Sequence, residues 1–279
     1  MAIPGNSAPE VKRAADIRRG SPKNRGAQIR TGDLSDPNGA RYQAAPHPET
    51  GHRVASMLRA VLFDVDFTLA RPGPELGPEG YVRAGERHGL RLEPGRYEVA
   101  RDAALVDLRR HPELEHDDEI WFRFTERIVR GMGGDADAAY GCAVEITRAW
   151  ERHENFELYD DVPDMLTALR SAGLQIGLVS NSARDVREFA QHHGLDVDAG
   201  ISSFHHGRTK PHASIFRAVL DLLGVEPAEG VMVGDTIADD VEGARALGMR
   251  AILLDREGLN PDFEPRLETL NELPPLLGL

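Results

Sequence analysis

The sequence predicts an α/β protein: a Rossmann-like parallel sheet with helices on both faces, and an all-helical cap domain inserted after the first strand. Two observations carry this prediction. Beyond Pro163, short apolar runs alternate with amphipathic helical stretches, which is typical of a parallel sheet covered by helices. Before that point, residues 79–155 show only the spacing of apolar residues that amphipathic helices have.

The individual elements follow from these patterns. The first strand is expected at residues 58–64, where the chain reads LRAVLFD. The insertion is expected to form helices, each ended by Gly, Pro or a charged turn, at 79–90, 96–110, 117–132 and 135–153. The other strands are expected at 174–180, 199–204, 230–235 and 249–255. The helices that accompany them are expected at 162–173, 183–194, 211–224 and 238–248, with a helical tail at 266–279.

Residues 1–56 differ from the rest of the chain. They are rich in Gly, Pro, Ser, Asn and Arg, and they show neither helical nor strand periodicity. Such a composition does not bury enough apolar surface to fold alone. The segment is either a disordered extension or a spurious stretch translated upstream of a true start at Met57. The Rossmann-like core is then expected at 57–74 and 156–279, and the helical cap domain at 75–155.

The composition excludes several classes of protein. With 41% apolar and 28% charged residues the chain is typical of soluble globular proteins. No run approaches the roughly eighteen apolar residues of a membrane span. The first thirty residues lack a signal-peptide core and the only cysteine is Cys142, so we expect a cytoplasmic protein. After residue 56 the chain carries 24 basic and 41 acidic residues, so no nucleic-acid partner is expected.

Polar side chains gather where the predicted strands end. They are Asp64 and Asp66 after the first strand, Ser180 and Asn181 at the second, Lys210 after the third, and Asp235 after the fourth. Ligands of open α/β sheets bind outside the carboxyl ends of the strands, so these side chains are expected to meet. Neighbouring carboxylates repel each other unless a cation lies between them. A metal ion is therefore expected, together with Lys210, the only lysine after residue 56.

Four motifs, read in order, resemble those of the haloacid dehalogenase superfamily of hydrolases, whose members are mostly phosphatases. They are VLFDVDFTL, GLVSNS, GRTKPHASIF and MVGDTIADDVEGARALGM. The resemblance covers residues 58–257, extends less securely to 279, and leaves out 1–56. It implies that the helical insertion is the cap of this superfamily, and that the substrate is a small phosphorylated metabolite.

The resemblance also implies roles for individual residues. Asp64 would be the nucleophile that forms an aspartyl phosphate. Asp66 would be the general acid and then the general base. Mg2+ would be held by Asp64, by the backbone carbonyl of Asp66 and by Asp235. The residues expected to bind the phosphoryl group are Ser180, Asn181 and Lys210. Asp239 and Asp240 would support the metal without binding it, although acids in a first helical turn also suit the helix dipole.

Asp66 favours a phosphatase over a dehalogenase, because a leaving alkoxide needs a proton and a leaving halide does not. The alternatives left open are a sugar-phosphate mutase, a 2-haloacid dehalogenase, and a receiver-like module that binds phosphate without turnover.

Two residues depart from the superfamily pattern. Phe67 stands where glycine is usual, and we expect it to alter the turn or to project toward the cap and substrate. His212 stands where an aspartate is frequent, and we expect it to cap or line the start of a helix with little effect on catalysis.

Overall fold

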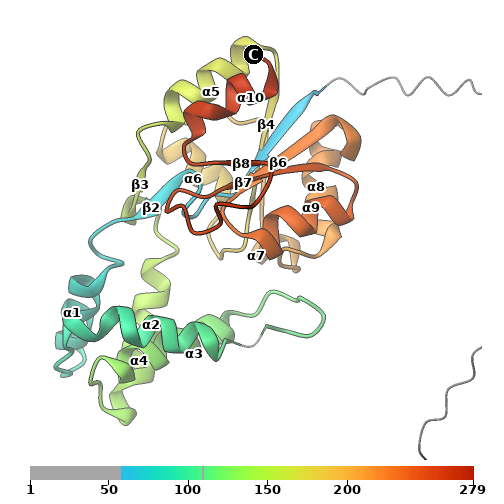
Figure 1. Ribbon diagram of the computed structural model, residues 1–279. Helices are drawn as coiled ribbons and strands as arrows, with labels where there is room; N and C mark the ends of the chain where they lie inside the picture. Colours follow the sequence, from blue (N-terminus) through green and yellow to red (C-terminus); the bar gives the residue numbers. More distant parts are fainter. Residues whose placement is uncertain (1–57, 109) are drawn as a thin grey trace, which may run out of the picture. The chain divides into compact units, whose positions relative to one another are not determined.

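The computed structural model describes residues 58–108 and 110–279 (Figure 1), so the expected extension at 1–56 lies outside the described residues. Its centre is a six-stranded sheet in which every neighbouring pair is parallel. The strands lie in the order β5 (Ala199–Ser202), β4 (Gln175–Ser180), β1 (Ala60–Phe63), β6 (Gly230–Gly234), β7 (Arg250–Leu254) and β8 (Arg266–Leu267). The predicted α/β sheet is confirmed.

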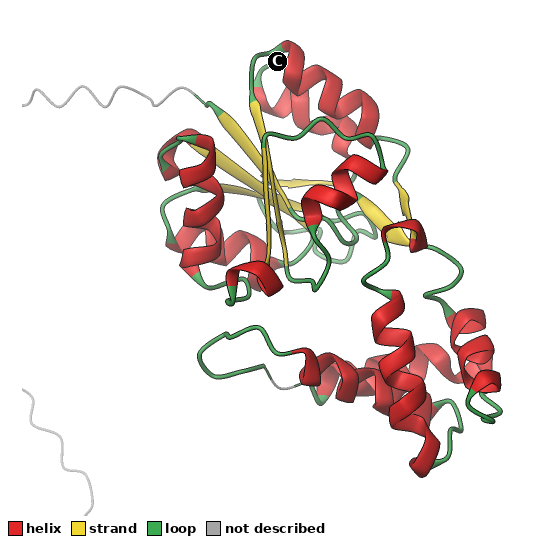
Figure 2. Ribbon diagram, turned by 180° about the vertical axis from the view of Figure 1, so that it is seen from behind, coloured by secondary structure: helices red, strands yellow, loops and turns green. Residues whose placement is uncertain are grey.

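Helices cover both faces of this sheet (Figure 2). Along β1, Val61 and Phe63 pack into one apolar cluster, whereas Ala60 and Leu62 pack into another on the opposite face. The first cluster includes α5 (Val162–Ser171), α6 (Val186–His192) and α10 (Leu273–Leu277). The second includes α8 (Ala213–Leu223) and α9 (Gly243–Ala246). Burial on both sides explains why the strands are continuous apolar runs.

The helical insertion lies between two short strands, β2 (Ala70–Pro72) and β3 (Phe156–Leu158), which pair antiparallel. It contains α1 (Pro78–Arg87), α2 (Tyr97–Val106), α3 (Asp118–Gly131) and α4 (Ala136–Ala149), with the 3-10 turns η1 (Pro94–Arg96) and η2 (His153–Asn155). These helices share an apolar core of their own, separate from the two clusters on the sheet. In the described part of the chain, no helix combines the length and apolarity needed to cross a bilayer.

Local side-chain contacts define several helix starts. Asp117 and Asp135 accept hydrogen bonds from the backbone two residues later, at 2.9 and 2.8 Å, and so cap α3 and α4. His212 caps α8 in the same way, because its Nδ1 accepts from the backbone N–H of Ser214 at 3.2 Å. His212 therefore caps a helix, as its position predicted.

The structure differs from the sequence prediction at several points, among them the strands β2 and β3, which were not expected. The tail at 266–279 is not helical throughout, because it begins with β8 and continues with η5 (Leu270–Glu272) before α10. Strand β5 ends at Ser202 and is followed by the short helix α7 (Ser203–His206). The helix expected at 238–248 begins as a π-helical segment, η4 (Ile237–Glu242). A two-residue strand and a π-helix are too short to leave a periodic pattern.

Candidate active site

The register of the sheet brings three strand ends together. Phe63 on β1 pairs with Leu178 on β4 and with Val233 on β6. The three strands therefore end at one edge, where the next polar residues along each chain segment are Asp64, Ser180 and Asp235. This is the edge at which open α/β sheets bind ligands.

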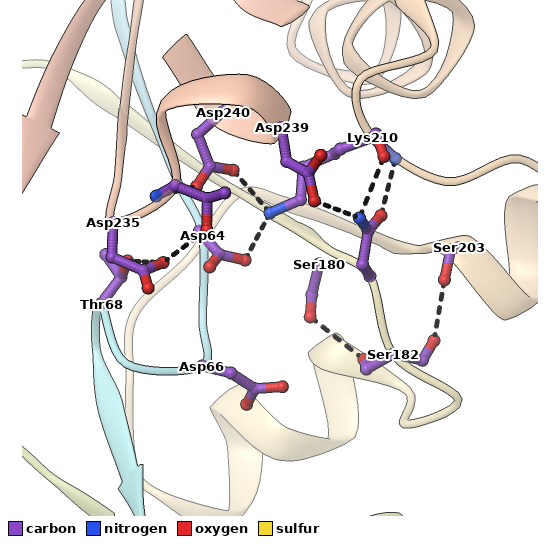
Figure 3. A network of polar contacts seen from close by, with 12 residues as sticks. Asp64, Asp66, Thr68, Ser180, Ser182, Ser203, Lys210, Asp235, Asp239 and Asp240 are labelled. Carbon is purple, nitrogen blue, oxygen red and sulfur yellow. Dashed lines mark hydrogen bonds and ion pairs between the residues drawn. The ribbon is translucent and has the colours of Figure 1, made fainter. Parts of the chain in front are cut away.

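The ammonium group of Lys210 lies within the carboxylates of this edge (Figure 3). Its Nζ donates to Asp64 Oδ1 at 2.6 Å and to Asp240 Oδ1 at 2.7 Å. Only 3% of the lysine side chain is exposed. Burial opposes its charge, but the carboxylates of Asp240 and Asp64 outweigh that effect and raise the pKa of Lys210 above its usual range. The lysine is therefore charged, and it compensates one of the negative charges beside it.

Asn181 holds the backbone of Lys210. Its Oδ1 accepts from the lysine backbone N–H at 2.6 Å, and its Nδ2 donates to the lysine carbonyl at 3.1 Å. Both polar ends of the amide are thus engaged with Lys210, although Asn181 was expected to bind phosphate. In this structure the residue fixes the position from which the lysine side chain enters the site.

Three carboxylates form a group that can hold a metal ion. Oxygens of Asp64, Asp235 and Asp240 all lie within 4.8 Å of one another. Burial raises the pKa of Asp64 well above its usual range, against the opposing charge of Lys210. Burial, together with the charge of Asp240, raises the pKa of Asp235 to about 6. Two buried acids and the half-buried Asp235 beside one ammonium leave excess negative charge, which a divalent cation would neutralise.

Asp240 reaches this group through a close approach of backbone and side chain. A Cβ on Gly234 would lie 2.3 Å from Asp240 Cγ, so the last residue of β6 has to be glycine. The other carboxylate oxygen of Asp240 accepts from the backbone N–H of Thr236 at 3.0 Å. Asp240 is fully buried. It was predicted to support the metal without binding it, but its carboxylate lies within the group that can hold the ion.

Asp239, which precedes Asp240 in the sequence, contacts other residues than the carboxylate group. It accepts from Asn181 Nδ2 at 3.4 Å and from the guanidinium of Arg110, which comes from the helical insertion. Arg110 also donates to the backbone carbonyl of Lys210 at 3.4 Å. Asp239 therefore joins the insertion to the lysine segment of the site, a contact that the sequence does not predict.

Ser180 and Thr68 lie buried near the carboxylate group. Ser180 Oγ donates to Ser182 Oγ at 3.1 Å, and Thr68 Oγ1 donates to Asp235 Oδ1 at 3.5 Å. Figure 3 shows Ser180 between Lys210 and Asp66, while the carboxylate of Asp66 is set apart from the other acids. The structure thus brings Asp64, Lys210, Asp235 and Asp240 into direct proximity and leaves the side chain of Asp66 outside their group.

Comparison with known proteins identifies the family. A model of haloacid dehalogenase-like hydrolases matches residues 58–248. The chain belongs to this family. The glyceraldehyde 3-phosphate phosphatase of Methanopyrus kandleri is 30% identical over 221 residues, which cover 75% of the hydrolase and 89% of that protein. The N-acylneuraminate-9-phosphatase of Mus musculus is 30% identical over 220 residues, which cover 74% and 86%.

A solved structure shares the fold. The putative HAD-hydrolase YfnB of Bacillus subtilis superposes with a TM-score of 0.61 at 19% identity, over 80% of the hydrolase and 100% of that chain. At this identity the likeness shows the fold alone, whereas the family match and the two phosphatase relatives identify the protein as a phosphatase-like member of the family.

Phe67, the residue that replaces the usual glycine, keeps the backbone conformation of a glycine. Its φ is +62°, in the left-handed region that side chains rarely adopt. The residue is 45% exposed, and its ring centroid lies 6.5 Å from that of Trp150, the residue at the end of α4. The phenylalanine of this hydrolase therefore preserves the turn and projects toward the helical insertion, one of the two outcomes expected.

Arg184 is a site residue that sequence reasoning missed. It lies after β4, is 2% exposed, and donates from Nη2 to the carboxylate of Asp66. Neither periodicity nor motif singles it out, because arginine makes up all but three of the 33 basic residues in the chain. The one available signal was its position in the sequence, two residues after Ser182 and close to the end of β4.

Proposed function

We propose that this hydrolase cleaves small phosphate monoesters, with Mg2+ as its metal, through an aspartyl-phosphate intermediate on Asp64. The observation that carries the proposal is the buried contact between Asp64 and Lys210 inside a group of carboxylates, at the carboxyl ends of β1 and β6. A carboxylate held against an ammonium group, beside a candidate metal site, is arranged to receive a phosphate dianion.

In the first step, an oxygen of Asp64 attacks the phosphorus of the ester. A bond forms between Asp64 and phosphorus while the ester P–O bond breaks, and the departing alcohol oxygen takes a proton from Asp66. In the second step, water attacks the same phosphorus and gives its proton to Asp66. The bond to Asp64 breaks, inorganic phosphate leaves, and both carboxyl groups return to their starting states.

The carboxylates fit a magnesium ion. Mg2+ is a hard cation that takes oxygen ligands and keeps several waters, and the side chains of Asp64 and Asp235 offer such oxygens, to which the backbone carbonyl of Asp66 would add one. When bound, the ion supplies charge neutralisation of the phosphoryl oxygens and of the acids around it. Asp240 is bonded to Lys210 and to the Thr236 backbone, so we assign it to orienting the lysine and completing the charge balance.

Lys210 and Ser180 would stabilise the transferring group. The ammonium of Lys210 already faces Asp64, so it lies where negative charge gathers as the new bond forms. Ser180 offers a hydroxyl whose present partner, Ser182, is itself a hydroxyl that can be exchanged for a phosphoryl oxygen. Asn181 would contribute through the position of Lys210.

The relatives support a small phosphorylated substrate, since one is named for glyceraldehyde 3-phosphate and another for N-acylneuraminate 9-phosphate. We propose that helices α1 to α4 act as the cap that selects the leaving group. Contacts such as the one between Arg110 and Asp239 bring this insertion to the edge of the site.

The test is release of inorganic phosphate from a panel of phosphate monoesters that includes the compounds named by these relatives. We expect release to require Mg2+, to stop with EDTA, and to fall at least about 1,000-fold in Asp64→Asn. A rapid acid quench should trap phosphorylated wild-type protein and none of the variant. Asp221→Asn, an exposed aspartate on α8, is the matched control and should keep full activity.

Three results would count against the proposal. They are transfer of phosphate between two positions of a sugar without net release, halide release from 2-haloacids, and stable phosphorylation of Asp64 without turnover.

A further inference from the structure

Arg184 is a charged side chain buried beside aromatic residues. Its side chain is 1% exposed, and its guanidinium carbon lies 3.8 Å from the ring centroid of Phe156 and 5.6 Å from that of Phe189. Aromatic faces attract a cation, but they do not replace the hydrogen bonds that it loses with water. A guanidinium in this setting needs an ionic partner.

Two groups from distant parts of the chain meet this need. Nη2 donates to the carboxylate of Asp66, and Nη1 donates to the backbone carbonyl of Trp150 at 2.6 Å. Nε has no partner among the described residues. The ion pair with the Asp66 carboxylate therefore provides the charge compensation, and the planar guanidinium fixes the direction of the group. The same oxygen can still accept from Nη2 when the other oxygen carries the proton of the proposed first step.

The second acceptor connects this pair to the helical insertion. Trp150 is the residue at which α4, the last helix of the insertion, ends. Phe156, under the guanidinium, begins β3, through which the chain returns to the core. Arg184 thus binds the acid that follows β1 and contacts both ends of the segment through which the chain returns from α4 to β3.

We infer that Arg184 is a positioning residue, which holds the carboxylate of Asp66 in register with the end of the helical insertion for proton transfer to the leaving group. The inference rests on the proposed function and adds a residue that lies outside the four motifs quoted from this sequence. Of the Asp66 side chain, 22% is still exposed, so the pairing with Arg184 does not close the group off from a substrate.

The chemistry gives this role a distinct signature. An alkyl alcohol is a poor leaving group and needs a proton as its bond to phosphorus breaks, whereas 4-nitrophenolate leaves without one. A residue that only stabilises the fold would affect both kinds of ester equally. A residue that positions the acid should matter for alkyl esters and matter little for 4-nitrophenyl phosphate.

The variant to test is Arg184→Met, because methionine keeps an unbranched chain that packs against Phe156 and removes only the donors. With the best alkyl monoester of the panel we expect kcat to fall about 10- to 100-fold with little change in KM. With 4-nitrophenyl phosphate we expect a change of less than about threefold. Equal losses with both esters, or no loss with either, would overturn the inference.

A double variant and a control separate positioning from stability. Asp66→Asn should show the same dependence on the leaving group, and adding Arg184→Met to it should cost no further activity, because both changes remove one function. Arg170→Met removes a guanidinium that is paired with Asp198 on the far side of the core at 2.6 Å. It should lower the melting temperature and leave the ratio of the two activities unchanged.

A crystal structure of Arg184→Met gives a readout that needs no activity. We expect the carboxylate of Asp66 to leave the position it occupies in the wild-type protein, and an unchanged carboxylate would overturn the inference. If the wild-type protein released no phosphate from any ester, the proposed function would fail, and this crystallographic comparison would still decide whether Arg184 sets the position of Asp66.

Discussion

Among the described residues, Asp235 is the acid of the three-carboxylate group that has no ion pair with Lys210. Its Oδ1 contacts the hydroxyls of Thr68 and Thr236, each at 3.5 Å, whereas Asp64 and Asp240 both reach the ammonium of Lys210. Burial, together with the charge of Asp240, raises the pKa of Asp235 to about 6 against the opposing charge of Lys210. In the folded protein without metal, Asp235 binds its proton more tightly than in the unfolded chain. The stability of metal-free protein should therefore fall as the pH rises from about 4 through 6.

Asp235→Asn should reverse that effect. At about pH 7.5 with EDTA, we expect the variant to melt a few degrees above the wild type, because it removes a buried charge. At about pH 4 the two should melt together, since the wild-type group is then neutral. Addition of Mg2+ should raise the melting temperature of the wild type only. Thermal melts at both pH values are the measurement, and a variant that is less stable at pH 7.5 would contradict this account.

Phe67 carries a strain that can be measured by comparison of two substitutions. Phe67→Gly and Phe67→Ala both remove the contact with Trp150, but only glycine adopts a φ of +62° without steric cost. We expect the glycine variant to exceed the alanine variant by about 1 kcal/mol in free energy of unfolding. Urea denaturation of both proteins measures the difference, and an alanine variant of equal or greater stability would contradict the strain.

At the scale of elements, the site depends on how β6 continues into η4. The strand ends at Gly234, and the π-helical turn that follows returns Asp240 to within contact of the strand end. The π-helical turn alone does not place the Asp240 carboxylate beside Asp64, because the strand end must also leave room for it. The absence of a side chain at one strand position makes the approach possible.

Gly234→Ala should therefore disrupt the metal site. The added methyl would lie 2.3 Å from Asp240 Cγ, so the aspartate must move and its contact with Lys210 is lost. We expect weaker Mg2+ binding by calorimetry and a loss of stability on the order of 2 kcal/mol. Gly230→Ala in the same strand is the control, because its methyl meets the flexible ends of Leu220 and Met249 at 3.2 and 3.3 Å and the Pro227 carbonyl oxygen at an ordinary contact distance of 3.8 Å. Equal Mg2+ affinities in the two variants would contradict the role of Gly234.

At the scale of the whole molecule, all described site residues belong to one compact unit. The chain divides into residues 1–51 and 52–279, and the sheet, the insertion and the site lie in the second unit. The described contacts of Asp64, Lys210, Asp235 and Asp240 are with each other and with neighbours in the described part of the chain.

A protein that begins at Met57 should therefore fold and act like the full chain. We expect its melting temperature to lie within about 2 °C of the full-length value and its kcat to be unchanged, because no described contact of the site is removed. Thermal melts and phosphate release with the same ester compare the two proteins. A large loss of activity in the shorter protein would show that residues 1–56 contribute to the site.

Much of the fold and of the site followed from the sequence. Asp64 and Asp235 were predicted as neighbours because each follows an apolar run of strand length, and parallel strands end at one edge of a sheet. Lys210 was singled out as the only lysine after residue 56. The strand β8 was missed because two residues leave no periodicity, and the central place of Asp240 was missed because it depends on a π-helical turn.

The sequence by itself determined which chemistry gathers at the carboxyl edge of the sheet, because the signals are local: an apolar run sets a strand, and the residue after it marks the strand end. Only the tertiary structure decided which charges pair. Asp66 meets Arg184 across 118 residues of sequence, and Asp64 meets Lys210 across 146. Ion pairs depend on distance and burial in three dimensions, and packing sets both of these only when the chain has folded.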